Sequence, residues 1–313
     1  MIRVLFQYDA GHWLRGELKA LADRGLEVIC HPESAGPPAP AQLAEIDAIW
    51  HVLQPVSAGM IAAAPRLRLI QKIGVGVNTI DLDAARDRDI VVCNMPGTNS
   101  QAVAEMTLLL MLSALRQQVL MDRACRSGAW SVPQARLEGF GELAGRTVGL
   151  VGFGEVPQRL APVLTALGAM VIYTARSARD VPWERVALDQ LLRRSDVVSL
   201  HIPLTPDTEQ LLDARRIATM KPGAVLVNTA RGALVDEAAL YVALRDGRLG
   251  GAGLDVFASE PVTAEHPLLS LDNVSVAPHL AWLTNETLSR SLSVAAHNTL
   301  AVDSGGKLLY RVC

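Results

Sequence analysis

The stretch Thr147-Val-Gly-Leu-Val-Gly-Phe-Gly-Glu-Val-Pro157 decides the fold of this 313-residue chain. Its apolar first half predicts a β-strand, and Gly152 and Gly154 predict a tight turn with a helix directly behind it. The first glycine permits the turn. The second lets a pyrophosphate approach the backbone, where the N–H groups and the positive dipole end of a helix favour an anion. Residues 147–157 therefore predict the phosphate-binding turn of a βαβ unit.

Two prolines depart from the usual form of this turn. Pro157 stands where the third glycine of G-x-G-x-x-G is expected, and its ring is bulkier where helix and strand pack closely. A proline is tolerated in the first turn of a helix, because its missing N–H costs little there. Pro162 lies farther along the same helix, and we expect it to kink the helix or to remove one backbone hydrogen bond.

The end of the next strand bears on the choice of dinucleotide. An acidic residue about 20 positions after the turn usually binds the adenosine ribose. Ala175 takes that place here, and Arg176 and Ser177 follow it. Alanine removes the carboxylate that would repel a 2′-phosphate, and arginine can pair with that phosphate. The sequence therefore favours NADP, with NAD as the alternative.

Outward from this unit, short β-branched runs alternate with helical stretches. Strands that are apolar on both faces belong to parallel sheets covered by helices, so we expect an α/β fold of two doubly wound domains. One domain is discontinuous, residues 1–96 plus 284–313, and residues 97–283 are inserted into it. A cleft between two such domains is a natural ligand site. The predicted strands are Val4–Asp9, Glu27–Cys30, Ala48–His51, Leu67–Ile73 and Ile90–Asn94 in the first domain, and Thr147–Gly152, Met170–Thr174, Val197–His201, Ala224–Asn228, Gly251–Asp255 and Val274–Ala277 in the second.

Two long helices are predicted near the domain boundaries. One covers Gln101–Arg126 and is apolar nearly all round, so it must be buried on several sides. The other covers about Asn285–Val302, and the residues after it are expected to return to the first domain.

The composition limits the classes of partner. The formal net charge is −3 and no basic stretch interrupts the sequence, so nucleic acids and anionic membranes are not expected as partners. The four cysteines, Cys30, Cys93, Cys125 and Cys313, are scattered and predict neither a metal site nor a disulfide framework. The N-terminus lacks a signal peptide, and the longest apolar run, residues 107–115, is too short to span a bilayer. These features predict a cytoplasmic protein.

A series of sequence blocks resembles the D-isomer-specific 2-hydroxyacid dehydrogenases, which include glyoxylate/hydroxypyruvate reductases and phosphoglycerate dehydrogenases. The blocks follow the family order and cover most of residues 70 to 285. The resemblance implies a Rossmann nucleotide-binding domain inserted into a flavodoxin-like substrate domain. The matching blocks are Gly74-Val-Gly-Val-Asn78, Asn94-Met-Pro-Gly97, Val103-Ala-Glu105, Gly152-Phe-Gly154, His201-Ile-Pro-Leu-Thr-Pro-Asp-Thr208, Met220-Lys-Pro-Gly-Ala-Val-Leu-Val-Asn-Thr-Ala-Arg-Gly232, Val235-Asp-Glu237, Gly253-Leu-Asp-Val256 and Ala277-Pro-His279.

The catalytic trio of the family matches Arg231, Glu260 and His279. Arg231 follows an apolar predicted strand, so it lies at a carboxyl end, where open α/β sheets bind ligands. Its planar fork can hold a carboxylate and the adjacent carbonyl oxygen. His279 also follows a strand and can supply the proton that reduction of a ketone requires. Glu260 would then hydrogen-bond the imidazole and fix its tautomer.

The resemblance also implies roles for residues around the trio. Backbone N–H groups of Val75 and Gly76 would bind the substrate carboxylate, since glycines allow such a nest of donors. The indole of Trp282 would narrow the pocket for small substrates, or else be a core or interface aromatic. The helix Gln101–Arg126 would pack against a second subunit in a homodimer. The implied cofactor-binding residues are Gly152, Gly154, Glu155, Val156, Arg176, Ser177, His201, Pro203, Thr208, Thr229, Ala230 and Asp255.

The resemblance implies an oxidoreductase that transfers a hydride from NADP or NAD to a small 2-oxo acid of the hydroxypyruvate or glyoxylate class. Glu260 argues against a formate dehydrogenase, whose pattern has Gln at that position. Two alternatives stay open on the sequence alone: an enzyme like phosphoglycerate dehydrogenase, and a nucleotide-sensing binding module like the corepressors of the family. Turnover with a 2-oxo acid would distinguish an enzyme from such a sensor.

Overall fold

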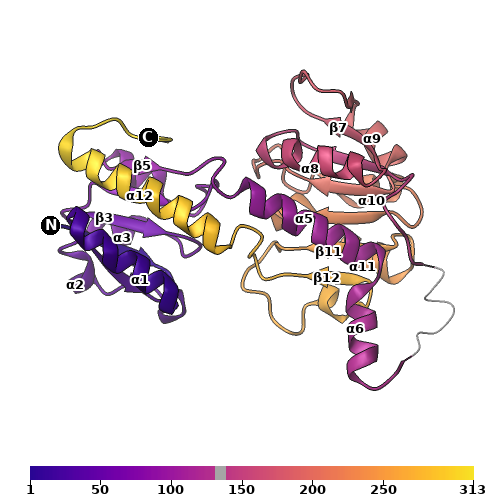
Figure 1. Ribbon diagram of the computed structural model, residues 1–313, viewed down its shortest axis with the longest axis horizontal. Helices are drawn as coiled ribbons and strands as arrows, with labels where there is room; N and C mark the ends of the chain where they lie inside the picture. The colour runs from indigo at the N-terminus through magenta and orange to yellow at the C-terminus, as the bar shows by residue number, and fades with distance from the viewer. Residues whose placement is uncertain (131–138) are drawn as a thin grey trace. The chain divides into compact units, whose positions relative to one another are not determined.

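The computed structural model describes residues 1–130 and 139–313, and it divides into two compact units (Figure 1). The first unit comprises Met1–Asn99 and Leu283–Cys313, and the second comprises Ser100–Trp282. The sequence predicts these divisions at 96/97 and 283/284. The divisions in the structure lie close to these, one just after the turn Asn94-Met-Pro-Gly97 and the other just after the segment that follows His279.

The first unit is built on a five-stranded sheet in which every pairing is parallel, with strand order β2-β1-β3-β4-β5. This is the flavodoxin-like order, and it confirms the predicted fold of this domain. The strands are β1 (Ile2–Gln7), β2 (Leu26–His31), β3 (Ala48–His51), β4 (Leu69–Lys72) and β5 (Val91–Cys93), and the helices are α1 (His12–Ala20), α2 (Pro40–Leu43), α3 (Ala58–Ala63), α4 (Leu82–Arg86) and α12 (Asn285–Ser304).

The last helix of the chain completes the first unit (Figure 1, yellow). Trp50 on β3 is fully buried and donates through Nε1 to the hydroxyl of Thr299 on α12 at 3.0 Å. Gln71 on β4 accepts a hydrogen bond of 2.7 Å from Asn298 of the same helix. The opposite face of the sheet presents apolar side chains such as Ile49 to α2, α3 and α4. Helices thus cover both faces, as a parallel sheet requires.

The second unit has a seven-stranded parallel sheet of order β12-β11-β10-β9-β6-β7-β8. Counted along this unit, it is the doubly wound 3-2-1-4-5-6 order with one strand added at the end, which confirms the Rossmann prediction. The strands are β6 (Thr147–Val151), β7 (Met170–Thr174), β8 (Glu184–Arg185), β9 (Val197–Leu200), β10 (Val225–Asn228), β11 (Gly251–Leu254) and β12 (Val274–Val276). The helices are α5 (Ser100–Leu115), α6 (Gln118–Arg126), α8 (Glu155–Ala166), α9 (Leu188–Arg194), α10 (Ala214–Thr219) and α11 (Glu237–Arg245).

Helices pack on both faces of this sheet as well. α5 and α8 cover one face, and α9, α10 and α11 cover the other. The approach of α5 to β11 is close: a Cβ on Gly253 would lie 2.8 Å from the Cβ of Leu110. Glycine at this strand position therefore sets the distance between helix and sheet.

The prediction of one helix over Gln101–Arg126 is wrong. The chain bends by 68° between α5 and α6, and Gln117 takes a left-handed φ of +47°. The carbonyl of Leu115 accepts from the N–H of Gly141 instead of continuing a helix. Among the described residues no single helix is long and apolar enough to cross a membrane, and only this bent pair reaches that length and composition together.

Candidate active site

The glycine turn between β6 and α8 is formed as the sequence predicts. Gly152 has a φ of +98°, and a Cβ there would lie 2.5 Å from the carbonyl oxygen of His201, so backbone and packing both require glycine. Gly154 is the N-cap of α8, and no side chain caps that helix. The first N–H of this turn to be bonded within the helix is that of Gln158, which donates to Gly154. The N–H groups of Glu155 and Val156 donate to no acceptor in the described parts of the chain.

These features fit a dinucleotide. A Cβ on Gly154 would meet no atom within 4 Å, and its φ is −89°, so nothing in the protein itself explains a glycine there. A phosphate close to the backbone would explain it. Pro157 is buried and occupies the third helical position, where an N–H has no intrahelical partner. Helix α8 continues through Pro162, so this proline removes one backbone bond without ending the helix.

The turn after β7 is held by a residue that the sequence did not single out. Arg185 on the short edge strand β8 donates from Nε and Nη2 to the carbonyl of Ala175 at 2.9 and 2.7 Å, and from Nη2 to that of Arg176 at 3.1 Å. Arg176 and Ser177 are exposed. The guanidinium of Arg185 therefore fixes the backbone turn that contains Arg176.

The loop after β9 is closed by its own side chains. The hydroxyl of Thr208 donates to the carbonyl of Pro203 at 2.8 Å and accepts from the N–H of Thr205 at 2.7 Å. His201, at the start of the loop, lies 2.9 Å through Nε2 from the hydroxyl of Ser199. Burial lowers the pKa of His201 to about 3, so this imidazole is neutral.

Arg231 is presented by a braced turn at the carboxyl end of β10. The side chain of Asn228 donates to the carbonyl of Arg231 at 2.8 Å and accepts from the N–H of Ala230 at 3.0 Å. The hydroxyl of Thr229 lies 2.9 Å from that of Thr107 on α5. The Arg231 guanidinium donates to the carbonyl of Ala230 at 2.6 Å, and no other described group accepts from it. Burial lowers the pKa of Arg231, and the charge of Glu260 opposes that shift.

Glu260 and His279 form a direct pair. Nδ1 of His279 lies 2.6 Å from Oε2 of Glu260, and Oε1 of the same carboxylate accepts from the N–H of Phe257 at 2.8 Å. Burial raises the pKa of Glu260, but the hydrogen bonds from His279 and Phe257 and the charges of His279 and Arg231 outweigh it, so the net shift is downward. Nε2 of His279 contacts no polar partner within the described ranges. The carboxylate is therefore ionised, and one imidazole nitrogen is left for a ligand.

The loop that carries His279 is anchored by Asp255. This carboxylate is 1% exposed and accepts from the N–H groups of Leu280 and Ala281 at 2.8 and 2.9 Å. Its own carbonyl accepts from the N–H of His279 at 2.7 Å. Burial raises the pKa of Asp255 against the effect of the two backbone bonds. The structure thus gives Asp255 a role in holding the histidine.

In the first unit, the loop after β4 exposes backbone donors. The carbonyl of Val75 accepts from the side chain of Asn94 at 2.9 Å, and that of Gly74 accepts from the N–H of Met95 at 2.8 Å. The N–H groups of Val75 and Gly76 donate to none of the described residues. Two backbone donors are therefore oriented by their neighbours and available to an anion.

Comparison with known proteins decides the family. A family model described as the NAD binding domain of D-isomer specific 2-hydroxyacid dehydrogenases matches residues 108–281. A glyoxylate reductase of Korarchaeum cryptofilum is 38% identical over 268 residues, covering 83% of this chain and 81% of that protein. The chain belongs to the D-isomer-specific 2-hydroxyacid dehydrogenases. It is a nicotinamide-dependent oxidoreductase that reduces 2-oxo acids to D-2-hydroxy acids.

Other known proteins are also similar to this dehydrogenase in sequence or structure. A D-3-phosphoglycerate dehydrogenase of Mycobacterium leprae is 42% identical over 241 residues, which are 75% of this chain and 45% of that protein. A crystal structure of a Thermus thermophilus protein superposes with a TM-score of 0.91 at 38% identity over the whole of both chains. An NADPH-dependent glyoxylate/hydroxypyruvate reductase of Sinorhizobium meliloti superposes with a TM-score of 0.84 at 29% identity, covering 100% of this chain and 98% of that one.

The second unit of the dehydrogenase contains most of the predicted site residues. Arg231, Glu260 and His279 follow the adjacent parallel strands β10, β11 and β12, so all three lie at one edge of the sheet. Val75 and Gly76 belong to the first unit. Trp282 ends the second unit with its side chain buried, at 8% exposure.

Several polar residues of the site were missed by sequence analysis. Asn228 and Arg185 fix backbone turns, and Glu237 holds the N–H of Ala258 at 2.8 Å in the loop before Glu260. An Asn at the end of a strand before a turn is a recognisable signal for such bracing. Arg185 and Glu237 gave no such signal, because their partners lie 9 to 21 residues away in the chain.

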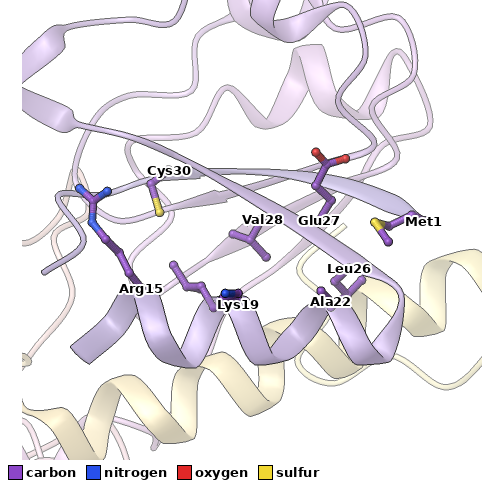
Figure 2. Close-up of a pocket in the computed structure, with 9 residues that line it drawn as sticks. Met1, Arg15, Lys19, Ala22, Leu26, Glu27, Val28 and Cys30 are labelled. Carbon is purple, nitrogen blue, oxygen red and sulfur yellow. The ribbon is translucent and has the colours of Figure 1, made fainter. Parts of the chain in front are cut away.

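The first unit of the dehydrogenase also contains a groove. It lies between α1 and the edge strand β2 in the first unit, with a volume of about 450 Å³ (Figure 2). Arg15, Lys19 and Cys30 are among the side chains that line it, and none of the predicted site residues does. Within the described ranges, no group of three His, Cys, Asp or Glu side chains is arranged to hold a metal ion.

Proposed function

We propose that this dehydrogenase reduces glyoxylate or hydroxypyruvate, with Arg231, Glu260 and His279 as its catalytic residues. The observation that carries the assignment is the 2.6 Å contact between the ionised Glu260 and the Nδ1 of His279, at the sheet edge where Arg231 also lies. The names of the relatives support the substrate class, since a glyoxylate reductase shares 38% identity with most of the chain.

The substrate is held as an anion in this proposal. The N–H groups of Val75 and Gly76 bind its carboxylate. These two N–H groups have no acceptor among the described residues. Arg231 has guanidinium donors without a described partner, and its fork binds the carboxylate and the carbonyl oxygen together. Polarisation of the carbonyl by this charge prepares the carbon for a hydride. In this proposal the indole of Trp282, which is buried, restricts the carbonyl carbon to hydrogen or a small substituent.

His279 supplies the proton. Its Nδ1 donates to Glu260, so Nε2 is the nitrogen that carries the transferable proton in the imidazolium form. Glu260 holds the ring orientation and stabilises the imidazolium until the carbonyl oxygen takes the proton. The product is a 2-hydroxy acid, and the reverse reaction returns the proton to the same nitrogen.

A nicotinamide dinucleotide would be held along the carboxyl edge of the second unit's sheet, and when bound it supplies the hydride. Gly154, Glu155 and Val156 would bind its pyrophosphate through the backbone. Towards the adenosine, the binding residues would be Arg176 and Ser177. The remaining contacts are proposed for His201, Pro203, Thr208, Thr229, Ala230 and Asp255, with Gly152 shaping the turn.

We also propose a preference for NADP over NAD. Ala175 presents no carboxylate to a 2′-phosphate, and Arg176 stands next to it on a turn fixed by Arg185. The Sinorhizobium meliloti relative is described as an NADPH-dependent reductase, which supports this preference. The contact is exposed, so we expect roughly a tenfold lower KM for NADPH than for NADH. Ala175→Asp should reverse the preference, whereas equal effects of Arg176→Ala on both cofactors would contradict it.

The decisive experiment is oxidation of NADPH and NADH over a panel of glyoxylate, hydroxypyruvate, pyruvate and larger 2-oxo acids. We expect the highest kcat/KM with glyoxylate or hydroxypyruvate. Highest activity in the reverse direction with 3-phosphoglycerate would favour the second candidate, for which the 42% identity to the mycobacterial enzyme is the supporting observation. Tight cofactor binding without turnover on any acid would instead indicate a nucleotide sensor.

A homodimer formed through α5 is proposed as the assembly. Leu109 and Leu112 of this helix are 59% and 37% exposed although eight other residues of the helix are buried in the unit. Exposed leucines on a helix whose other faces are largely buried favour a second copy of the chain as the cover. Sedimentation at micromolar concentration should show a dimer, and Leu109→Lys should shift it to monomer.

The four cysteines form no disulfide, which supports a cytoplasmic location.

A further inference from the structure

A second carboxylate–imidazole pair lies beside the Glu260–His279 pair. Oε2 of Glu237 is 3.3 Å from Nε2 of His266, and the two side chains are 19% and 23% exposed. Glu237 is the first residue of α11, which comes after the short helix Gly232–Leu234 that follows Arg231. His266 precedes the short helix Pro267–Ser270. The two pairs therefore come from different segments around the same loop.

Both pairs hold the backbone between Phe257 and Glu260. The N–H of Phe257 donates to Oε1 of Glu260 at 2.8 Å, and the next N–H, that of Ala258, donates to Oε1 of Glu237 at 2.8 Å. The ring of His266 meets that of Phe257 edge to face, with centroids 5.3 Å apart. Glu237 and His266 thus contact two successive residues of one loop.

Burial does not fix this loop after Phe257. Phe257 is 8% exposed, and its backbone packs against Gly232 so closely that no Cβ fits there. Residues 258–260, in contrast, lie at the surface. The hydrogen bond from Ala258 to Glu237 therefore holds the exposed part of the loop from outside it, together with the packing of Gly232 on the Phe257–Ala258 peptide and the contact of Glu260 with His279.

The histidine side of the catalytic pair is anchored independently. Asp255 accepts from the N–H groups of Leu280 and Ala281 and, through its carbonyl, from that of His279. Loss of the contact at Ala258 is therefore expected to displace Glu260 more than His279. The 2.6 Å distance between Glu260 and His279 thus depends on both anchors.

We propose that Glu237 and His266 are positioning residues for the reduction, which hold the Ala258 end of the loop so that Glu260 meets Nδ1 of His279. Glu237 acts by its hydrogen bond to Ala258. His266 orients the Glu237 carboxylate and packs on Phe257. The inference rests on the proposed role of Glu260. A displacement near 1 Å at such a contact lowers a rate by about 100-fold, so the effect belongs in kcat.

The experiment measures kcat and KM for glyoxylate reduction, or for hydroxypyruvate if that acid is reduced faster, together with the Tm of each variant. Glu237→Ala should lower kcat by about 10- to 100-fold and leave KM for NADPH unchanged. Glu237→Gln keeps an oxygen acceptor for Ala258 and should stay within about threefold of wild type. Asp189→Ala removes a first-turn acid from α9 in the same unit and serves as the matched control.

A double-mutant cycle with Glu260→Gln separates positioning from general stability. If Glu237 acts through Glu260, adding Glu237→Ala to Glu260→Gln should change kcat by less than about twofold. If Glu237→Ala lowers kcat equally in the wild type and in Glu260→Gln, the role of the Glu237–His266 pair is overturned and that of Glu260 is not. The same conclusion follows if the kcat of Glu237→Gln is as low as that of Glu237→Ala. Wild-type kcat in Glu260→Gln would overturn the role proposed for Glu260 and this inference with it. His266→Phe, which keeps a ring against Phe257, should lose less activity than His266→Ala.

Discussion

Gly154→Ala is expected to weaken dinucleotide binding while leaving the stability of the protein without ligand almost unchanged. Gly154 has an extended backbone with a φ of −89°, which alanine adopts without strain. A Cβ there would meet no atom within 4 Å. The requirement for glycine that we propose is then the approach of a pyrophosphate to the N–H groups of Glu155 and Val156. A methyl group at this place would hold the phosphate away from them.

Gly152→Ala provides the matched contrast in the same turn. Its φ of +98° costs an alanine about 1–2 kcal/mol, and the Cβ would lie 2.5 Å from the carbonyl oxygen of His201, an overlap of about 1–3 kcal/mol. Together these lower the free energy of unfolding by about 2–5 kcal/mol, or the Tm by roughly 4–20 °C. Gly152 is thus required by the fold, whereas Gly154 is expected to be required by the ligand.

The magnitude for Gly154→Ala follows from the bonds at risk. Loss of one charge-assisted hydrogen bond costs about 1.5–3 kcal/mol, which raises the Kd of NADPH by about 10- to 100-fold. The assay is calorimetric titration, with the Tm measured with and without cofactor. NADPH at about 100 times the wild-type Kd stabilises the protein by about 2.7 kcal/mol, and a tenfold weaker Kd removes about 1.3 kcal/mol of this. A wild-type Kd for both NADPH and NADH in Gly154→Ala would refute the reasoning.

Four further changes test other parts of the structure. Arg231→Ala should lower kcat/KM by at least about two orders of magnitude, and Arg231→Lys should recover only part of it because the fork is lost; wild-type kinetics in Arg231→Ala would disprove the assignment. Arg185→Ala should raise KM for NADPH by about 3- to 10-fold and affect NADH less, as steady-state kinetics with each cofactor will show. Gly16→Ala, in the exposed interior of α1 with no atom near its Cβ, should raise the free energy of unfolding in urea by about 0.5–1 kcal/mol. Burial and the charge of Lys72 lower the pKa of His51, so the unfolded chain takes up a proton below about pH 6.5 that the folded protein does not; stability should fall as the pH decreases from there, with a shallower dependence in His51→Gln.

The strands and their order were the most predictable part of the fold. Ala48–His51 and Met170–Thr174 have in the structure the bounds that their β-branched and aromatic residues predict. Strand β8, Glu184–Arg185, was missed because two charged residues at a sheet edge carry no apolar pattern. The bend at Gln117 was missed for a related reason. No glycine or proline marks it, and the bond that ends α5 comes from Gly141, 26 residues later in the chain.

The candidate site likewise has a part that the sequence predicted and a part that it did not. Arg231, Glu260 and His279 were found because each has a reactive side chain in a block that resembles the family. Their supports were not found, because an Asn, a Glu or an Arg that binds a carbonyl or an N–H has no signature of its own. Glu237 belongs to one of the matching blocks, yet its role depends on a contact with Ala258, 21 residues away. The reactive groups can be predicted from their spacing along the chain. The groups that orient them can be identified only from the folded backbone.

Each residue of the trio stands on a turn with its own polar clamp: Asn228 for Arg231, Glu237 for the loop of Glu260, and Asp255 for the loop of His279. The three turns follow adjacent strands whose carboxyl ends the parallel sheet places side by side. The sheet fixes only the first residue of each turn, so the polar clamps must fix the positions of the three side chains. Hydride and proton transfer need the reacting atoms within a few tenths of an ångström, which an exposed loop without such a clamp does not maintain. Substitutions at the clamps should therefore act mainly on kcat, and their effects should be non-additive with those of the residues that they hold.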